Sequence, residues 1–246
     1  MKRFRVVNKK RLQQITKSSK KQKKQILVEK IFSNISDKYD FMNDIMSFGL
    51  HRLWKSEFIK LIDLKKNSVV LDLASGSGDL IKLLDHRSDC YFIGYDSSIE
   101  MLKQARKKVI TKNVEFVNGR AEKMPFKQNS FDVIIASFGI RNFYDLEKSL
   151  KEVKRVLKKN SKFYCLEFSQ INNFTFRKLF NIYSKVIPIY GKFLLNNREA
   201  YEYLIKSIEK FPDQIELTKI LLNAGFKNIE VIDILDGLAS IHISET

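Results

Sequence analysis

The sequence predicts an α/β fold with a seven-stranded, mostly parallel sheet, helices on both faces and an antiparallel hairpin at the C-terminal end. Three observations predict this fold. Runs of β-branched and aromatic residues alternate with amphipathic helical segments from residue 68 onward. The first run ends in a loop of small residues that opens a helix, as in parallel sheets that bind cofactors. The last two runs flank Asp236-Gly237, a dipeptide typical of a tight turn between antiparallel strands.

The predicted elements follow one another at the spacing of strand–helix–strand units. An amphipathic helical region comes first, with apolar residues from Ile31 to Met46 at three- and four-residue spacing. Strands are expected at Ser68–Leu73, Tyr91–Tyr95, Val114–Val117, Phe131–Ser137, Lys162–Phe168, Ile229–Ile234 and Leu238–Ile243. Helices are expected at Asp79–Asp85, Ser98–Val109, Asp145–Leu157 and Pro212–Leu222.

Residues 171–210 interrupt this alternation and are rich in aromatic side chains. We expect a helical insertion here, between the fifth strand and the next sheet helix. It forms either the core of a capping subdomain or an apolar wall for a long apolar substrate.

Length and charge indicate a single domain over residues 29–246, preceded by a basic tail over residues 1–28. A chain of 246 residues with 44% hydrophobic side chains can build one sizeable core. The tail holds eleven of the 45 Lys and Arg residues and no acid, and therefore most of the net charge of +17. It is interpreted as a solvated disordered arm, as an anchor to anionic lipid, or as a nucleic-acid arm or transit peptide.

Cysteine and histidine usage predicts neither a disulfide nor a metal centre. Cys90 and Cys165 each stand alone in an apolar run, which is typical of buried thiols in a reducing compartment. His51, His86 and His242 lack the spacing of metal ligands. No apolar run of the sequence reaches the ~18–20 residues of a membrane-spanning helix.

The loop after the first strand predicts the kind of cofactor. A dinucleotide-binding loop would need a third glycine at position 81, where this chain has Ile81. The pattern present, Asp-x-Ala-x-Gly-x-Gly over residues 72–78, is similar to the S-adenosyl-L-methionine loop of class I methyltransferases. The ligand of that loop carries a positive sulfonium and no phosphate. The likeness implies four cofactor-binding residues: Asp72, Gly76, Ser77 and Gly78.

Residues at later strand ends complete the expected cofactor site. Asp96 ends the second strand, where a carboxylate can accept hydrogen bonds from both ribose hydroxyls. Arg120, Ala121 and Glu122 follow the third strand, where this fold contacts the adenine. Ser137 ends the fourth strand and is expected to lie under the sulfonium.

Two longer motifs are more specific than the loop. One runs from Tyr39 to Trp54 and begins Tyr-Asp-Phe-Met-Asn, and the other is Ser-Phe-Gly-Ile-Arg-Asn at residues 137–142. With them the chain resembles the ubiquinone/menaquinone biosynthesis C-methyltransferase family (UbiE/MenG) over roughly residues 28–243. The resemblance implies a Rossmann-like class I methyltransferase. Such an enzyme transfers a methyl group from S-adenosyl-L-methionine to a ring carbon of a prenylated quinol.

This reaction implies three catalytic candidates. A phenol with a pKa of ~10 is only about 0.1% ionised at pH 7, and a nearby guanidinium lowers such a pKa by ~1–3 units. We expect Arg141, just after the fourth strand, to lower the pKa of the substrate hydroxyl in this way. Asn142 and Tyr39 are expected to orient the substrate hydroxyls, directly or through a water acting as base. The alternatives are an ion pair for Arg141 and a cap on the core for Tyr39. His51 is either a base or a core histidine.

The chain departs from the family pattern in three places. Lys159-Asn160-Ser161 replaces the usual Pro-Gly-Gly, which should loosen a turn far from the cofactor. Arg120 replaces a small polar Asn on the adenine side, which leaves backbone contacts but not a familiar side-chain role. The basic tail replaces the usual N-terminal segment, so nothing about those residues carries over.

The resemblance also implies partners and a location. The substrate is a benzoquinol, a naphthoquinol or both. The protein is expected in the cytoplasm at the inner membrane face, or on the matrix side in mitochondria, held by the basic tail or the apolar insertion. A homodimer or a quinone-biosynthesis complex stays open.

Three other functions are alternatives to quinol methylation. A nucleic-acid methyltransferase is disfavoured because most of the net charge lies in one tail. The fourth strand also lacks the Asn/Asp-Pro-Pro-aromatic motif of enzymes that methylate the amino groups of bases, and the chain contains no Pro-Pro. A nicotinamide oxidoreductase is disfavoured by Ile81, and a non-catalytic scaffold is the third alternative.

Overall fold

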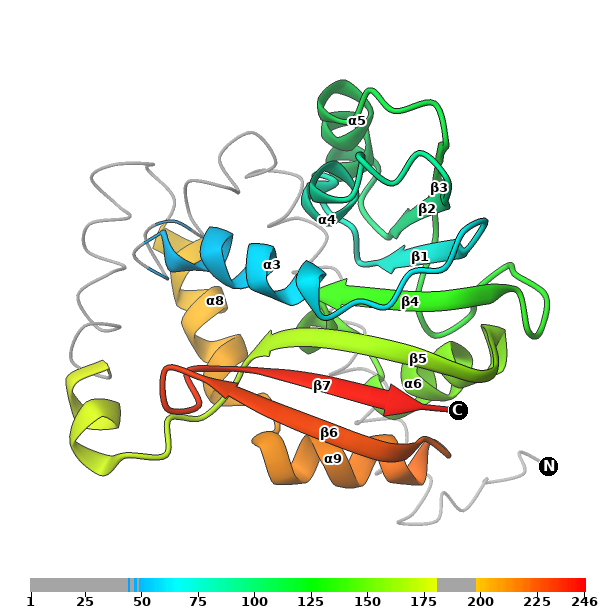
Figure 1. The fold of residues 1–246 in the computed structure, drawn as a ribbon. Coiled ribbons are helices and arrows are strands. Elements are labelled where there is room, and N and C mark those ends of the chain that lie inside the picture. The colour runs from blue at the N-terminus through cyan, green and yellow to red at the C-terminus, as the bar shows by residue number, and fades with distance from the viewer. Residues whose placement is uncertain (1–43, 45–46, 48, 181–197) are drawn as a thin grey trace, which may run out of the picture.

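A computed structural model describes residues 44, 47, 49–180 and 198–246, drawn in colour in Figure 1. They form a seven-stranded sheet in the order β3-β2-β1-β4-β5-β7-β6. The strands pair in parallel from β3 to β5, and β7 runs antiparallel to both β5 and β6. The predicted sheet and its C-terminal hairpin are therefore confirmed. The strands are β1 (Val69–Leu73), β2 (Tyr91–Asp96), β3 (Val114–Asn118), β4 (Phe131–Ser137), β5 (Leu157–Phe168), β6 (Lys227–Ile234) and β7 (Ala239–Glu245).

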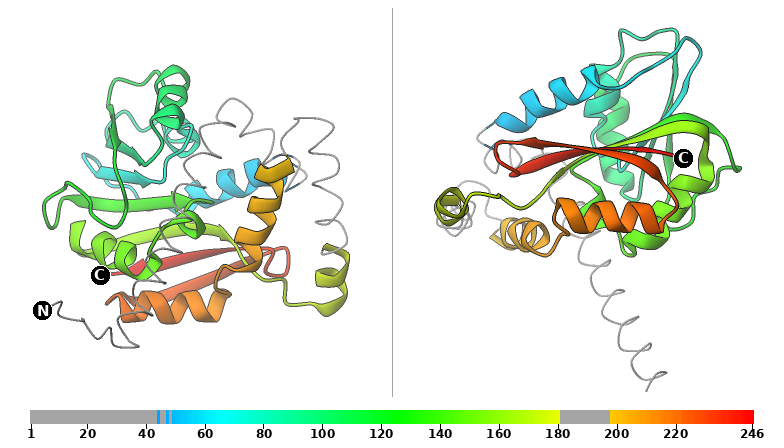
Figure 2. Two further views of the ribbon diagram at one scale, coloured as in Figure 1. Left: turned by 180° about the vertical axis from the view of Figure 1, so that it is seen from behind. Right: turned by 60° about the horizontal axis from the view of Figure 1, so that its bottom comes forward.

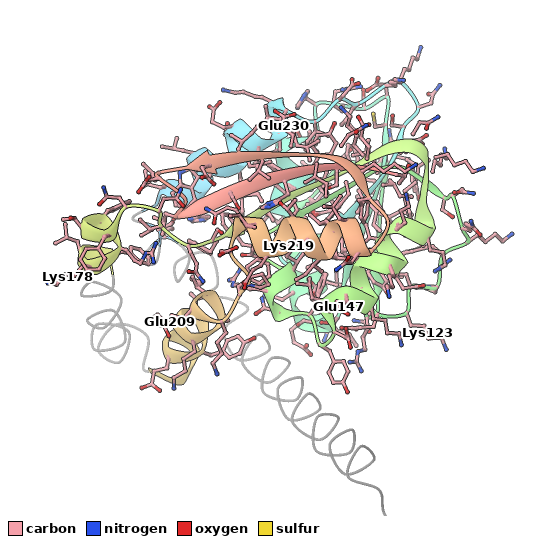
Figure 3. The ribbon with its side chains drawn as sticks, turned by 90° about the horizontal axis from the view of Figure 1, so that it is seen from below. Lys123, Glu147, Lys178, Glu209, Lys219 and Glu230 are labelled. Atoms are coloured by element: carbon pink, nitrogen blue, oxygen red, sulfur yellow. The ribbon has the colours of Figure 1, made fainter. Side chains whose placement is uncertain are left out.

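Helices cover both faces of the sheet, as the right-hand view of Figure 2 shows. Along β4, Val133 and Ile135 face one hydrophobic cluster, whereas Ile134 and Ala136 face the other. This is the two-residue alternation of a strand buried on both sides. The first cluster includes side chains of α3 (Leu50–Lys60) and α4 (Asp79–Leu83), and the second those of α6 (Leu146–Val156) and α9 (Gln214–Asn223). Lys219 of α9 and Glu147 of α6 are exposed on the outer side of this layer (Figure 3).

Side-chain caps fix where several helices begin. Ser98 accepts a hydrogen bond from the Met101 N–H at the start of α5 (Ile99–Lys108). Asp145 accepts one from the Lys148 N–H at the start of α6. Asp213 and Glu216 form a reciprocal capping box at the start of α9. Such caps satisfy backbone N–H groups that have no partner inside the helix. The caps explain why these helices begin within a residue or two of the predicted positions.

The structure corrects the predicted start of the fifth strand. β5 begins at Leu157, paired with Phe131 of β4, and the pairing resumes at Val133 and Lys162 after a register shift. Asn160 lies in the bulge with a φ of 57°, and asparagine adopts this left-handed conformation more readily than most residues. The Lys-Asn-Ser segment that replaces Pro-Gly-Gly therefore still turns the chain. Two helices also end earlier than predicted, at Leu83 and Val156.

The predicted insertion is described in part. Residues 174–180 are helical, and α8 (Arg198–Glu209) follows, with residues 181–197 outside the described part. α8 lies across the carboxyl ends of β4 and β5 (Figure 1). Its Leu204 and Ile208 are buried in the same cluster as Trp54 of α3. The predicted basic tail, residues 1–28, lies outside the described residues. No described helix is long and apolar enough to cross a membrane.

Two neighbouring leucines on α9 test the packing of this layer. Leu221 is fully buried, whereas Leu222 is 52% exposed. We expect Leu221→Ala to lower the free energy of unfolding by ~2–5 kcal/mol because it leaves a cavity in the core. Leu222→Ala, the matched control, should change it by about 0.5 kcal/mol or less. Urea unfolding of the two variants measures both values, and equal losses would contradict the described packing.

Candidate active site

A pocket opens where the loops after β1, β2, β3 and β4 meet. The empty space within it is about 810 Å³, open solvent at the mouth included. It lies at the carboxyl ends of the parallel strands, where the strand order reverses between β1 and β4. Of the predicted site residues, six line this pocket: Gly76, Asp96, Arg120, Ala121, Glu122 and Asn142.

Asp96 joins two of the loops that form the pocket. Its Oδ2 accepts a hydrogen bond from the Gly76 N–H at 2.9 Å, and its Oδ1 accepts one from the Ser98 N–H at 2.8 Å. Burial raises the pKa of this carboxyl, and the backbone N–H donors oppose that rise. The side chain is thus held rigidly on the pocket wall. This is the placement required to accept hydrogen bonds from a ribose diol.

In the glycine loop, Gly76 lines the pocket, whereas Ser77 and Gly78 lie beneath it. Gly76 and Gly78 have φ values of 54° and 80°, in the left-handed region that favours glycine. A Cβ on Gly78 would lie 2.9 Å from Cγ2 of Val109, so the loop packs closely on the chain that follows α5. Ser77 is buried, and its Oγ donates to Oδ1 of Asp79 at 3.4 Å. Ser77 and Gly78 therefore support the loop rather than line the pocket.

Asp72 lies fully buried on β1, directly below the loop. Its Oδ2 has no hydrogen-bond partner among the described residues. Burial raises the pKa of Asp72 well above its usual range, the charge of Lys55 opposes the rise, and Asp96 and Asp79 add to it. A buried carboxylate oxygen without a partner is costly unless a donor or cation meets it. The residues around the loop thus fit S-adenosyl-L-methionine, which carries a sulfonium and an ammonium.

Lys55 is a residue of this site that the sequence analysis missed. It lies on α3 with a side chain only 7% exposed, and its Nζ is 2.7 Å from Oδ2 of Asp79. Asp79, the first residue of α4, also accepts a hydrogen bond from Lys108. These two ammonium groups hold the pKa of Asp79 far below its usual range, although burial opposes them. One feature of the sequence could have indicated it: Lys55 lies on the same helix face as the apolar residues Trp54 and Phe58, both of which are buried.

The adenine side of the pocket is formed by the segment after β3. The Tyr95 hydroxyl donates to the Arg120 carbonyl at 3.1 Å, and burial raises the pKa of Tyr95 to about 12. The Arg120 guanidinium lies 5.3 Å from the centroid of the Tyr144 ring and 3.6 Å from Glu122. The Arg120 backbone is thereby fixed, while its exposed side chain closes the outer wall. An arginine can thus replace the expected asparagine here without disturbing the backbone.

The end of β4 meets the glycine loop from the other side. Ser137 is half-buried and is not on the pocket wall, whereas Phe138 and Gly139 are. A Cβ on Gly139 would lie 2.5 Å from Cβ of Ala74, so the loops after β1 and β4 are in direct contact. Ala74 and Phe138 both have left-handed φ values, 57° and 52°. Such strained backbone clusters at functional sites.

Arg141 follows β4 as expected, but its side chain is buried. Its Nη1 lies 2.7 Å from Oε1 of Glu167, and its backbone N–H donates to Oε2 of the same side chain at 3.2 Å. Nη1 also donates to the Phe138 carbonyl. Burial raises the pKa of Glu167, and Arg141 opposes that rise. The structure therefore has the ion pair considered as the alternative for Arg141.

Of the other catalytic candidates, the structure describes Asn142 and His51. Asn142 lines the pocket, and its Oδ1 accepts a hydrogen bond from the Tyr203 hydroxyl at 2.9 Å. Tyr39 lies outside the described residues. His51 is buried, with Nδ1 3.0 Å from Ser47 Oγ, and burial lowers its pKa to about 4, helped by the charge of Lys55. A histidine in this setting is neutral and belongs to the core.

The remaining pocket wall was not predicted residue by residue. Every such residue lies at or shortly after the end of a strand or in the first turn of the following helix, and that position is the only signal the sequence offers. They are Leu73, Ala74, Tyr95, Ser97, Ser98, Met101, Gly119, Phe138, Gly139, Phe143 and Tyr144.

The fold and the site together define the class of protein. The strand order, the glycine loop after β1 and the acid at the end of β2 are those of a class I methyltransferase, whose cofactor is S-adenosyl-L-methionine. More particularly, the chain belongs to the ubiE/COQ5 methyltransferase family, whose model matches residues 16–245. The family resemblance predicted from the motifs is thereby confirmed.

Relatives and solved structures agree with this placement. The chain is 46% identical over 230 residues to a ubiquinone/menaquinone biosynthesis C-methyltransferase UbiE of Rickettsia felis, covering 89% of this chain and 92% of the relative. It is also 46% identical over 236 residues to the UbiE of Rickettsia bellii, covering 92% and 95%. Among solved structures, a SAM-dependent methyltransferase of Thermotoga maritima matches with a TM-score of 0.66 at 19% identity, covering 89% of this chain and 99% of the other. At this identity the structural likeness shows the fold alone.

The raised pKa of Asp72 predicts how cofactor binding depends on pH. An ordinary Asp has a pKa of about 3.9, so Asp72 becomes protonated and neutral at a higher pH than that. Affinity for the cationic cofactor should therefore weaken as the pH is lowered through the raised pKa of Asp72, by up to about tenfold per pH unit per proton taken up. Titration calorimetry at several pH values measures this.

The variant Asp72→Asn isolates the contribution of this carboxyl. It should bind the cofactor more weakly at pH 8 and lose most of the pH dependence, with a small remainder from Asp96. A variant that is folded by circular dichroism yet keeps the full pH dependence would refute the role of Asp72.

Proposed function

We propose that the protein transfers a methyl group from S-adenosyl-L-methionine to a ring carbon of a prenylated quinol in ubiquinone or menaquinone biosynthesis. The observation that carries this proposal is the 46% identity, over most of the chain, to proteins named ubiquinone/menaquinone biosynthesis C-methyltransferases. The substrate is 2-polyprenyl-6-methoxy-1,4-benzoquinol, demethylmenaquinol or both.

The cofactor, when bound, supplies a methyl group on a positively charged sulfonium. Asp96 is placed to hold a ribose, and Asp72 to meet a positive charge from below the loop. Gly76 keeps the wall open where a side chain would intrude, since a Cβ there would lie 3.3 Å from the Met101 methyl group. These groups fix the donor, and good alignment of two reactants is worth on the order of 7–11 kcal/mol.

The acceptor side offers a hydrogen-bond donor rather than an exposed cation. A quinol carbon attacks well once a neighbouring hydroxyl is ionised, and a donor to that oxygen favours the ionised form. Asn142 is the polar side chain at this end of the pocket wall, since Arg141 is paired with Glu167 behind it. We assign Asn142 to the substrate oxygen, and we assign Arg141 to holding the turn that carries Asn142. Tyr39 remains a proposed orienting residue.

Apolar side chains support a water-poor site. Phe138, Phe143 and Met101 line the pocket, and Phe138 packs against Phe168 with ring centroids 4.7 Å apart. Positive charge on the donor and negative charge on the ionised quinol both disappear as the methyl group moves. A site that excludes water therefore favours transfer.

A membrane-bound substrate motivates the proposed location. A polyprenyl chain partitions into lipid, so the enzyme is proposed to work at a membrane surface. The basic tail of residues 1–28 would bind anionic lipid, at about 1 kcal/mol per basic residue near the surface. We propose the cytoplasmic face of the inner membrane, with the mitochondrial matrix side as the alternative. Association as a homodimer or with other quinone-biosynthesis proteins is also proposed.

Quinone analysis of cells lacking the protein tests the function. We expect a demethyl benzoquinone, a demethyl menaquinone or both to accumulate, because the ring methylation step is missing. Mass spectrometry of lipid extracts identifies the species and thereby the substrate. Re-expression of the wild-type chain should restore the methylated quinone, whereas Asp96→Asn should restore it poorly. An unchanged quinone profile in the deletion strain would rule out the proposed function.

A further inference from the structure

Tyr203 on α8 reaches the turn that carries the acceptor-side candidates. Its hydroxyl lies 2.9 Å from Oδ1 of Asn142, a residue of the pocket wall in the 3-10 turn η2 (Ile140–Asn142). The Tyr203 ring packs against the core cluster that includes Trp54 and Phe168. α8 belongs to the insertion at the carboxyl ends of the strands (Figure 1). A helix outside the cofactor loops thus contacts the acceptor side directly.

The protonation of Tyr203 and the contacting atom of Asn142 fix which way this hydrogen bond runs. Burial raises the pKa of Tyr203 to about 12, while the nearby charge of Arg141 lowers it and that of Glu167 raises it. The hydroxyl is therefore protonated at neutral pH. The contacting atom of Asn142 is the amide oxygen Oδ1, which can only accept, so the hydroxyl proton is directed to Asn142. Tyr203 is the donor and Oδ1 of Asn142 the acceptor.

This direction determines which end of the Asn142 amide is left for a ligand. A side-chain amide has one acceptor oxygen and one NH₂ donor, and here the oxygen is engaged by Tyr203. The donor end is therefore the one that can serve the pocket. An NH₂ group stabilises a phenolate oxygen, whereas an amide oxygen in its place would repel it.

We propose that Tyr203 is a positioning residue that holds the Asn142 amide with its NH₂ group toward the acceptor hydroxyl. The inference rests on the proposed quinol methylation. It also couples the docking of α8 to catalysis, because the amide is oriented only when the helix is in place. Tyr203 itself does not line the pocket.

The test is Tyr203→Phe in the full-length protein, assayed with a demethyl quinol that carries a short prenyl chain. Loss of one neutral hydrogen bond should lower kcat roughly 5- to 20-fold. The KM for the quinol and the dissociation constant of S-adenosyl-L-methionine should stay within about twofold. Tyr164→Phe is the matched control, because it removes a hydroxyl that accepts the Asp63 N–H at 3.3 Å. It should leave all three constants unchanged.

A double variant separates positioning from a merely structural role. If Tyr203 acts through Asn142, adding Tyr203→Phe to Asn142→Ala should change kcat less than about twofold. Additive losses would overturn the proposal, as would a single Tyr203→Phe variant with wild-type kcat. Asn142→Asp provides a second route that leaves Tyr203 intact. It keeps an acceptor for Tyr203 but offers the pocket no NH₂, so kcat should fall at least as far as in Asn142→Ala, and wild-type kcat would overturn the proposal.

The outcomes also separate this inference from the proposed function. A wild-type protein that binds the cofactor but does not methylate the quinol refutes the function itself. An active wild type with unaffected Tyr203 and Asn142 variants refutes only the positioning role.

Discussion

The buried ion pair between Arg141 and Glu167 is the interaction on which the acceptor side depends. The two side chains are 0% and 1% exposed, and burying such charges costs several kcal/mol per ion unless partners satisfy them. Glu167 meets that cost with three donors: the guanidinium, the Arg141 N–H and the Phe168 N–H. The pair therefore fastens the turn after β4 to the end of β5. The left-handed Phe138, the contact of Gly139 with Ala74 and the pocket residue Asn142 all lie in the turn that is attached in this way.

The two halves of the pocket have complementary electrostatics. On the donor side, burial and the neighbouring carboxylates of Asp96 and Asp79 raise the cost of ionising Asp72, and the charge of Lys55 partly offsets it. Such a site favours a cationic ligand. On the acceptor side, the charge of Arg141 is compensated by Glu167, and the group on the wall is a neutral amide. The donor side therefore offers carboxylates to a cationic ligand, and the acceptor side offers a neutral hydrogen-bonding group to the quinol oxygen.

The fold and the positions of Asp96 and Gly76 could be predicted because strand ends in a parallel sheet converge at one edge. The family and Asn142 could be predicted from the motif at residues 137–142. The direction in which a side chain points after a strand end could not be predicted from the sequence. Arg141 and Asn142 are adjacent, yet one is buried against β5 and the other faces the pocket, and the deciding partner, Glu167, is 26 residues away. Lys55 and Tyr203 were missed for the same reason, since their partners Asp79 and Asn142 lie far along the chain.

The most direct measurement of the central claim follows a labelled methyl group. The purified protein is incubated with a demethyl quinol and S-adenosyl-L-methionine carrying ¹³C in its methyl group, and the product is examined by NMR. The account predicts a ¹³C signal in the range of a methyl group on an aromatic carbon, with loss of one ring proton. A signal in the range of a methoxy carbon, or no transfer to the quinol at all, would contradict it.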